Sequence, residues 1–217
     1  AFTFADELRE ACLQEVLRLR EEVWFSRGVA LAPECNRHIV RTSIAECQKL
    51  RQTRHVKHQV IAAACSVRHA GEIARLYREA GCVDDEIHSR QTKPQRHNVR
   101  SRLKDGLIDV IVQVEMLGEG FDHPPLSVAA VFRPFRSLSP YVQFVGRVMR
   151  TVRQNGPNDP DNCGVVVSHV GLNTERHWSE FRSLDKQDQE LWSGLAGGEP
   201  AVSASGGNLG HGVTQEF

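Results

Sequence analysis

Residues 60–81, VIAAACSVRHAGEIARLYREAG, contain the pattern on which the fold depends. Residues 60–66 form an unbroken run of apolar and small side chains, which is typical of a strand buried on both faces of a sheet. From residue 69 the apolar positions recur at helical spacing, and the stretch ends on Gly81, a residue type that often closes helices. The stretch therefore predicts one buried strand followed by one amphipathic helix.

The same alternation continues along the chain. Further strands are expected at residues 85–89, 109–114, 127–132 and 164–169, and further helices at residues 93–106, 140–150 and about 174–184. Strands that alternate with helices favour a parallel sheet with helices on both faces. The predicted fold class is therefore α/β, with a mostly parallel sheet in a three-layer arrangement.

The segments on either side of this region differ from it. Two helices are expected ahead of the sheet, at residues 4–23 and at about 35–50, and they would form a helical connector or cover over residues 1–56. The α/β domain would then span residues 57–190. Residues 191–217 are rich in Gly, Ser and Ala with few large apolar side chains, so a flexible tail is expected there.

The overall composition is that of an ordinary globular protein. Apolar residues make up 40% of the chain and charged residues 25%, which excludes general disorder. The 27 basic and 27 acidic residues balance, which argues against a strongly basic nucleic-acid protein but allows a local basic face. No apolar run approaches the ~20 residues of a membrane span, so no membrane partner is expected. The first residue is alanine rather than methionine, which indicates a fragment of a longer protein.

The cysteines and histidines predict no metal site. The six cysteines include no C-x-x-C pair and no regular spacing, so neither a zinc site nor a disulfide framework is indicated. They are typical of reduced, mostly buried thiols in a cytoplasmic protein. His55 and His58 lie three residues apart, but no third ligand is evident in the sequence.

The loop after the strand at 109–114 is a candidate ligand site. It reads EMLGEGFDHPP, and in doubly wound sheets ligands bind beyond the carboxyl ends of the strands. Gly118 and Gly120 allow a partner to approach the backbone closely, while Asp122 can accept hydrogen bonds from a ribose or orient a cation. A tight turn into the next strand explains the two glycines equally well.

The stretch YVQFVGRVMR (141–150) predicts an unusual helix. Ser139 is a candidate N-cap and Pro140 a candidate first helical residue. At ~100° per residue, one arc contains Gln143, Gly146, Arg147 and Arg150, and a different arc contains Val142, Val145 and Met149. Two arginines three residues apart repel each other unless an anion such as a nucleotide phosphate lies between them. A solvated face with two ordinary surface arginines is the alternative.

Taken together, these stretches resemble the C-terminal motor domain of superfamily 2 helicases and translocases. QFVGRVMR (143–150) is similar to the sixth motif of that family, Q-x-x-G-R-x-x-R, MLGEGFDHP (116–124) to the fifth motif, and residues 60–81 to the fourth motif with its following helix. The resemblance spans roughly residues 58–170 in the order of the family, and its wording is closest to the DEAH-like DNA motors. It implies a RecA-like fold.

The resemblance also implies a nucleotide site. Arg147 and Arg150 would reach the γ-phosphate of ATP that is bound, with Mg²⁺, mainly to an N-terminal RecA-like domain of the same parent protein. Gln143 would position the same network, and Gly146 would leave room for the nucleotide. Asp122 would lie near the ribose hydroxyls, with Gly120 beside it.

A nucleic-acid site is implied on the same grounds. Ser66, together with backbone N–H groups around Leu117 and Gly118, would hold nucleic-acid phosphates, contacts that position a strand without reading its sequence. DNA is the expected partner, and RNA is less favoured.

One part of a complete motor is missing from the sequence. No phosphate-binding loop G-x-x-x-x-G-K-[S/T] occurs in the chain. DEIH at residues 85–88 matches the D-E-x-H signature of magnesium binding, but it lies between the fourth and fifth motifs, where the family has a strand leading to a serine, here Ser89. We interpret it as a coincidence. The chain alone is therefore not expected to hydrolyse ATP appreciably.

Two other functions fit parts of the pattern. A nucleic-acid-binding or scaffold module could keep the fold without motor activity. A Rossmann-like enzyme could use the GEG at residues 118–120 for a small cofactor, but that fold requires its glycine loop after the first strand of the sheet, and here the loop follows a later one.

Overall fold

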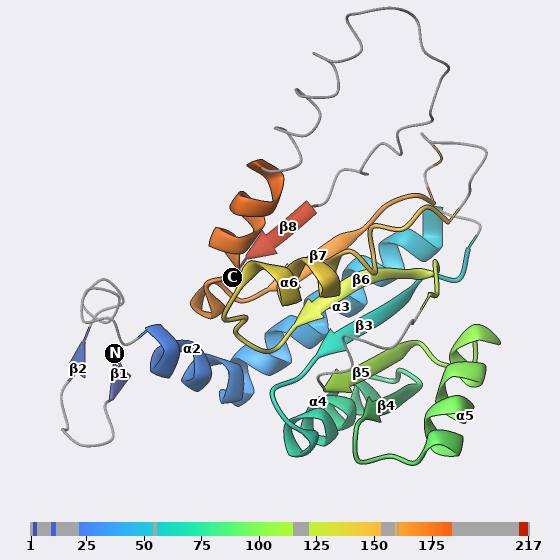
Figure 1. Cartoon of the computed structure of the whole chain (residues 1–217), viewed down its shortest axis with the longest axis horizontal. Coiled ribbons are helices and arrows are strands. Elements are labelled where there is room, and N and C mark those ends of the chain that lie inside the picture. The colour runs from blue at the N-terminus through green and yellow to red at the C-terminus, as the bar shows by residue number, and fades with distance from the viewer. Residues whose placement is uncertain are drawn as a thin grey trace, which may run out of the picture.

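Six parallel strands form the main sheet of the computed structural model (Figure 1). Across the sheet their order is β4 (Asp84–His88), β5 (Val110–Val114), β3 (Gln59–Ala63), β6 (Leu126–Val131), β7 (Val165–Ser168) and β8 (Val213–Glu216). The structure describes residues 2–3, 10–11, 22–53, 56–114, 122–152, 159, 161–183 and 213–216. Each strand predicted from the sequence is present and starts within one residue of its expected position.

Helices cover both faces of this sheet. On one face α3 (Pro33–Thr53) packs on β3, β6 and β7, and its neighbour α4 (Val67–Glu79) packs on β4 and β5. Helices α5 (Lys93–Lys104) and α6 (Leu138–Val145) join strands in the opposite direction across the sheet, so right-handed crossovers place them on the other face. Figure 1 shows α3 behind β6 and α6 in front of it. The three-layer α/β fold predicted from the sequence is confirmed.

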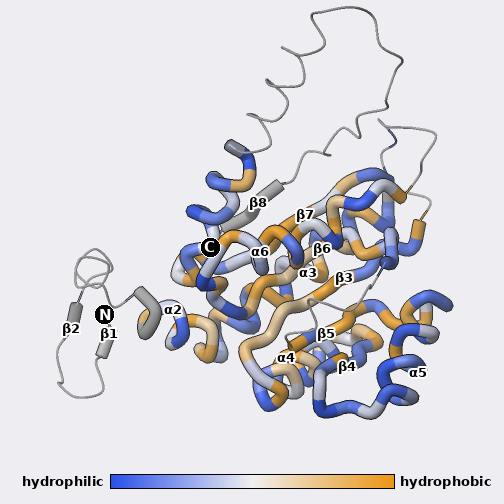
Figure 2. Tube along the Cα trace, in the orientation of Figure 1, coloured by the Kyte–Doolittle hydropathy of each residue, from blue (hydrophilic) through white to orange (hydrophobic). Residues whose placement is uncertain are grey.

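The centre of the sheet is the core of the molecule. Every residue of β3, β5, β6 and β7 is buried, as expected for parallel strands that are covered on both faces. Figure 2 shows hydrophobic residues along these strands, whereas α5 is mostly hydrophilic. Phe132, next to β6, packs edge-on against Tyr77 of α4 with ring centroids 6.2 Å apart. This contact holds α4 against the centre of the sheet.

Local sequence explains where α4 and α5 begin and end. The Ser66 side chain accepts a hydrogen bond from a backbone N–H in the first turn of α4, and Thr92 forms a capping box with Gln95 at the start of α5. Both helices are followed by a glycine in the left-handed region, Gly81 with φ 86° and Gly106 with φ 69°. The two helix ends predicted on these glycines are confirmed.

The first helix predicted from the sequence, residues 4–23, is only partly tested: it is wrong at Glu10–Ala11, whereas its last two residues, 22 and 23, are helical. Within residues 4–23, Glu10–Ala11 form strand β2, which pairs antiparallel with β1 (Phe2–Thr3). Strand pairing uses the same backbone N–H and C=O groups as a helix would, so the two structures exclude each other. The first described helix is instead α2 (Glu22–Leu31), which packs on the short helix η1 (Val170–Leu172).

The end of the chain adds an edge strand to the sheet. Val213–Glu216 pair with β7 as β8, within the stretch predicted to be a flexible tail, and residues 184–212 lie outside the described part of the chain. Residues 174–183 are helical, as predicted. Within the described residues, no helix combines the length and apolarity needed to cross a bilayer.

Candidate functional site

Helix α6 begins two residues earlier than the sequence predicted. Its N-cap is Ser137, so Ser139 and Pro140 lie in the first turn rather than at the cap. Proline is tolerated there because the first N–H groups of a helix have no partner within the helix. The Ser139 hydroxyl instead accepts a hydrogen bond from the exposed side chain of Gln143 at 3.4 Å.

Helix α6 also ends earlier than predicted, and this changes the positions of the two arginines. It ends at Val145, and the next residues form i to i+3 backbone hydrogen bonds of 3.0 to 3.2 Å. Such a turn advances about 120° per residue instead of ~100°. Arg147 is therefore buried, with 7% of its surface exposed, whereas Arg150 is exposed. Of the four residues predicted to share one arc, Gln143 and Arg150 are exposed and Gly146 is half-buried, whereas Arg147 is buried.

Two glycines keep residues 146–150, the arginine segment, close to the sheet. A Cβ atom at Gly164, just before β7, would lie 2.5 Å from the Val148 carbonyl oxygen. A Cβ atom at Gly146 would lie 2.9 Å from the Val142 carbonyl oxygen. Both distances are well below the optimal separation of non-bonded atoms. The arginine segment can approach the start of β7 this closely because position 164 has no side chain.

The structure brings together two residues that were predicted from different motifs. The Arg150 guanidinium donates a hydrogen bond to the Asp122 carboxylate and forms an ion pair with it. The side chains are 39% and 74% exposed respectively, so water screens this pair and it contributes little to stability. The pair therefore shows that the fifth and sixth motifs lie next to each other. Little free energy is needed to break it.

Arg147 and Arg100 are two further arginines near Arg150. Burial lowers the pKa of Arg147, and the positive charges of Arg150 and Arg100 lower it further. Arg100 comes from α5, which the sequence analysis did not assign to the site. The guanidiniums of Arg147, Arg150 and Arg100 thus lie close enough to repel one another, and that of Arg150 is paired with Asp122. A bound anion would stabilise such an arrangement.

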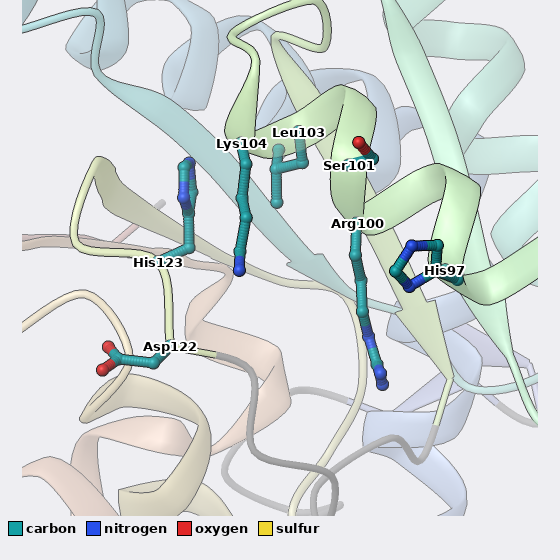
Figure 3. A pocket seen from close by; sticks show the side chains of 7 residues that line it. All are labelled: His97, Arg100, Ser101, Leu103, Lys104, Asp122 and His123. Carbon is teal, nitrogen blue, oxygen red and sulfur yellow. The ribbon is translucent and has the colours of Figure 1, made fainter.

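A cavity of about 490 Å³ adjoins Asp122. It is lined by His97, Arg100, Ser101, Leu103, Lys104, Asp122 and His123 (Figure 3). Figure 3 shows the side chains of Arg100 and Lys104 extending in the same direction from α5, whereas the carboxylate of Asp122 points away from them. The cavity thus has a cationic wall, and the carboxylate of Asp122 is paired with Arg150.

A buried hydrogen-bond network fixes the wall that carries Asp122. The Gln59 amide nitrogen donates to the carbonyls of Leu103 and Ile108, so its oxygen faces His123 and accepts from Nε2–H of that ring at 2.5 Å. Burial lowers the pKa of His123, and the nearby Lys104 ammonium lowers it further. The ring is therefore neutral at pH 7, and it ties the residue after Asp122 to the start of β3.

Ser66 lies at the other end of β3. Its Oγ accepts the His69 backbone N–H at 3.2 Å, and its own hydroxyl proton remains available to a ligand. Five residues at ~3.3 Å each make β3 roughly 16 Å long, so Ser66 and the Asp122 wall are separated by about that distance. Ser66 and Asp122, which are described residues of the predicted nucleic-acid and nucleotide sites, thus lie near opposite ends of β3.

Comparison with known proteins identifies the family. The model of the helicase conserved C-terminal domain matches residues 41–152, more than half of the chain. The chain belongs to this family. The match begins within α3 and ends just after the arginine segment, so it contains β3 to β6, α6 and every residue predicted for the site. The predicted membership of superfamily 2 is confirmed.

Individual proteins that resemble this chain are at most about 30% identical to it in the three comparisons below. UvrABC system protein B from Synechocystis sp. is 30% identical over 175 residues, which are 75% of this chain and 25% of that protein. The pre-mRNA-splicing ATP-dependent RNA helicase prp28 from Aspergillus fumigatus is 29% identical over 104 residues, 48% of this chain and 12% of that protein. Among solved structures, the Pyrococcus furiosus Hef helicase domain is 15% identical with a TM-score of 0.45, covering 65% of this chain and 28% of that one. This helicase C-terminal domain thus spans a quarter or less of these two curated relatives.

Some predicted residues lie outside the described part of this helicase C-terminal domain. These are Leu117, Gly118 and Gly120, whose roles stay predictions. The structure adds His97, Arg100 and Lys104, which the sequence analysis missed. Helix α5 has five lysines and arginines and no acidic residue, and that charge pattern was the available signal.

The D-E-x-H match of residues 85–88 lies within β4, the strand at one edge of the sheet. The Asp85 carboxylate forms an ion pair with Arg102 of α5. This location agrees with its interpretation as a coincidence. Among the described residues, no group of three or more His, Cys, Asp or Glu side chains is arranged to hold a metal ion.

Proposed function

We propose that this chain is the second motor domain of an ATP-dependent DNA helicase or translocase. The observation that carries the proposal is the group of Arg100, Arg147 and Arg150 beside Asp122, together with membership of the helicase C-terminal family. ATP and Mg²⁺ would be held mainly by an N-terminal RecA-like domain of the parent protein. Arg147 and Arg150 would stabilise charge on the γ-phosphate, an effect on the order of 10³ to 10⁵ in hydrolysis rate.

The ion pair between Arg150 and Asp122 suggests how the site responds to nucleotide. A triphosphate is a stronger partner for a guanidinium than an exposed carboxylate, so it would draw Arg150 away from Asp122. Asp122 would then be able to accept hydrogen bonds from the ribose hydroxyls. Gln143, Gly146 and Gly120 complete the proposed site. Gln143 is exposed and would face a partner domain, and the two glycines would leave room for the nucleotide.

Arg147 would contribute to stabilising the γ-phosphate in a different way from Arg150. Because it is buried, its guanidinium loses less conformational freedom on binding than a surface arginine and acts in a region of reduced dielectric. We assign the stronger contact with the γ-phosphate to Arg147. Arg150 would act as the exchangeable cation.

The nucleic-acid grip is proposed for the opposite edge of the sheet. Ser66 at the start of α4 would bind a backbone phosphate with its hydroxyl and the positive end of the helix, together with the N–H groups around Leu117 and Gly118. Closure of the parent protein around ATP, followed by reopening, would shift this grip along the strand. The sequence of the fifth motif resembles that of DNA motors and favours DNA, whereas prp28 is an RNA helicase. The ATPase rate should therefore be measured with DNA and with RNA.

The test is the nucleic-acid-stimulated ATPase rate of the parent protein. Arg147→Gln is expected to lower kcat by roughly 10³ and Arg150→Gln by a smaller factor, because each removes charge stabilisation in the transition state. Arg176→Gln is the matched control, since Arg176 is exposed and pairs only locally with Glu180. An unchanged rate in Arg147→Gln would refute the motor proposal and favour the scaffold alternative. Stimulation by RNA but not by DNA would refute the DNA assignment.

A further inference from the structure

Helix α2 (Glu22–Leu31) lies ahead of the family's domain in the chain, because the family match begins only at residue 41. It packs on η1, which closely follows β7, so it lies near the carboxyl ends of the strands. Figure 1 shows α2 on the side of the molecule toward which β6 points. Ligands of open α/β sheets bind at this end of the strands. An element from outside the family's domain therefore borders the end of the sheet at which Ser66 lies.

Close packing fixes the orientation of α2. Phe25 and Val29 are buried, and a Cβ atom at Gly171 of η1 would lie 2.8 Å from a Val29 methyl carbon and 3.2 Å from the Phe25 ring. The helix can approach η1 this closely because position 171 has no side chain. Arg27 is two residues from both Phe25 and Val29, so it lies on the opposite side of the helix, and it is exposed.

A buried contact joins the loop that carries Ser66 to the helix after α2. The His69 ring accepts the Cys65 backbone N–H at 3.2 Å with Nδ1, and its Nε2 lies 3.1 Å from the side-chain amide of Asn36. Asn36 and His69 are both buried. Asn36 lies in the first turn of α3, which begins two residues after α2 ends. The end of α2 is therefore held close to Cys65 and Ser66.

Arg27 brings a positive charge to this loop. Among the described residues it forms no ion pair with a carboxylate. Burial raises the pKa of the Cys65 thiol, whereas the positive charges of Arg133 and Arg27 lower it, so both guanidiniums lie near this half-buried residue. Arg133 lies over the Phe135 ring, 5.4 Å from its centroid. Two cations thus flank the residue before Ser66, and Arg27 is the one that comes from outside the family's domain.

A nucleic-acid strand fits this distribution of charge. Ser66 offers a phosphate only neutral groups, its hydroxyl and nearby backbone N–H groups. Every further nucleotide of a bound strand brings another negative charge, which neutral groups do not offset. We infer that Arg27 binds a backbone phosphate adjacent to the one at Ser66, without reading the base sequence. This inference rests on the proposed nucleic-acid grip and adds to it a residue from outside the family's domain.

The experiment is a fluorescence anisotropy titration of the parent protein with a labelled DNA single strand of about 12 nucleotides, at several salt concentrations. Arg27→Gln is expected to raise Kd by about three- to tenfold. The slope of log K against log salt should fall by about 0.7, the value for one phosphate contact on a single strand. Arg27→Lys should keep most of the slope, because an ammonium also neutralises a phosphate. Glutamine and lysine are both good helix formers, so α2 should persist in both variants.

Arg41→Gln is the matched control. Arg41 is exposed on the neighbouring helix α3 and likewise forms no ion pair with a carboxylate among the described residues. Its Kd is expected to stay within about twofold of the parent protein, with an unchanged salt slope. An equal loss in Arg41→Gln would show general electrostatic attraction and overturn the inference. An unchanged Kd in Arg27→Gln, with weaker binding in Ser66→Ala, would overturn the inference and leave the proposed grip standing. Absence of DNA binding by the parent protein would overturn both.

The ATPase assay separates a nucleic-acid contact from a role in hydrolysis. Arg27→Gln should need about three- to tenfold more DNA for half-maximal stimulation, in parallel with its higher Kd. Its rate at saturating DNA should equal that of the parent protein, because the missing contact is made only to DNA. A lower rate at saturation would assign Arg27 to hydrolysis and overturn the inference.

Discussion

Arg147 and Arg150 illustrate at the residue scale how far sequence spacing determines a side chain's environment. The two were predicted to share one arc of the helix, yet Arg147 is buried and Arg150 forms an ion pair with Asp122 at the surface. Spacing was reliable only as far as Val145, where the helix ends. Association of Arg150 with Asp122 agrees with the resemblance that assigned both to one nucleotide. Neither the burial of Arg147 nor the presence of Arg100 follows from the motifs, because both depend on how α5 and α6 pack.

Replacing Arg147 by methionine should lower stability as well as activity. Arg147 is buried and interacts with further groups of the protein, so methionine would leave those groups without a partner, and we expect a loss of about 1–3 kcal/mol in the free energy of unfolding. Urea denaturation of the chain would measure this change. Arg150→Met, at an exposed position, should stay within about 0.5 kcal/mol of the parent chain. An unchanged free energy of unfolding in Arg147→Met would contradict the expectation.

Gly164 offers a second residue-scale prediction. In Gly164→Ala the new Cβ would meet the Val148 carbonyl oxygen at 2.5 Å, a backbone atom that can move only with the whole arginine segment. The expected loss is about 1–3 kcal/mol in the free energy of unfolding, with a lower ATPase rate in the parent protein. Gly28→Ala in α2 is the control, because its Cβ would meet no atom within 4 Å and alanine favours the helix by up to ~1 kcal/mol. Equal effects at both positions would show that the close approach does not matter.

At the scale of elements, much of the structure could be predicted, and the reasons for success and failure differ. The strands were located because their β-branched, fully buried runs are unlike the polar helices between them. The ends of α4 and α5 followed from Gly81 and Gly106. The end of α6 could not be predicted from local sequence, and the residues after it pack closely against Gly164, which lies just before β7. The cavity beside α5 was missed because a helix rich in lysine and arginine usually has these side chains exposed to solvent, and the sequence does not show which other residues lie opposite them.

The junction of α5 with β3 gives an element-scale prediction. Gln59 donates to the carbonyls of Leu103 and Ile108 and accepts from His123, and it is 1% exposed. Gln59→Met would leave three buried polar groups without this partner, so we expect a loss of about 2–4 kcal/mol in the free energy of unfolding. Gln48→Met, at an exposed position of α3, should change it by less than about 0.5 kcal/mol.

Nucleotide binding provides a second measurement at this junction. The hydrogen bonds of Gln59 hold His123, the residue after Asp122. We therefore expect the affinity of the parent protein for ATP to fall in Gln59→Met, even in buffer where the variant remains folded. The circular dichroism spectrum of the variant would establish that it is folded. A variant that loses stability but keeps full ATP affinity would show that the network does not position Asp122.

At the scale of the whole molecule, buried and half-buried histidines link stability to pH. Burial lowers the pKa of His69, His123 and His169 below the ordinary value of 6.5. His69 illustrates the cause, because its Nδ1 accepts the Cys65 backbone N–H at 3.2 Å and would lose this bond if it were protonated. The unfolded chain therefore binds protons that the folded chain excludes. The resulting stability is complete above about pH 6.5 and is lost as the pH falls through the lowered pKa values.

This linkage predicts a lower urea midpoint at pH 5.5 than at pH 7.5. Each histidine that is protonated only in the unfolded chain contributes up to about 1.4 kcal/mol per pH unit. His69→Gln should reduce the pH dependence, since glutamine can accept the same N–H bond without titrating. His97→Gln is the control, because His97 is exposed on α5. Equal midpoints at the two pH values would be inconsistent with neutral buried histidines.

The position of β3 also has a consequence for synthesis of the chain on the ribosome. This strand is the third across the sheet but the first of the six in the chain, and its Val60 pairs with Val110 and Val128. At about 5–20 residues per second, β3 leaves the ribosome on the order of several seconds before β6 can join it. Until residue 114 has emerged, this mostly apolar strand has neither neighbour, and until residue 131 has emerged it still lacks β6. The nascent chain should therefore need protection by chaperones until residue 131 has emerged, and the sheet should close only then.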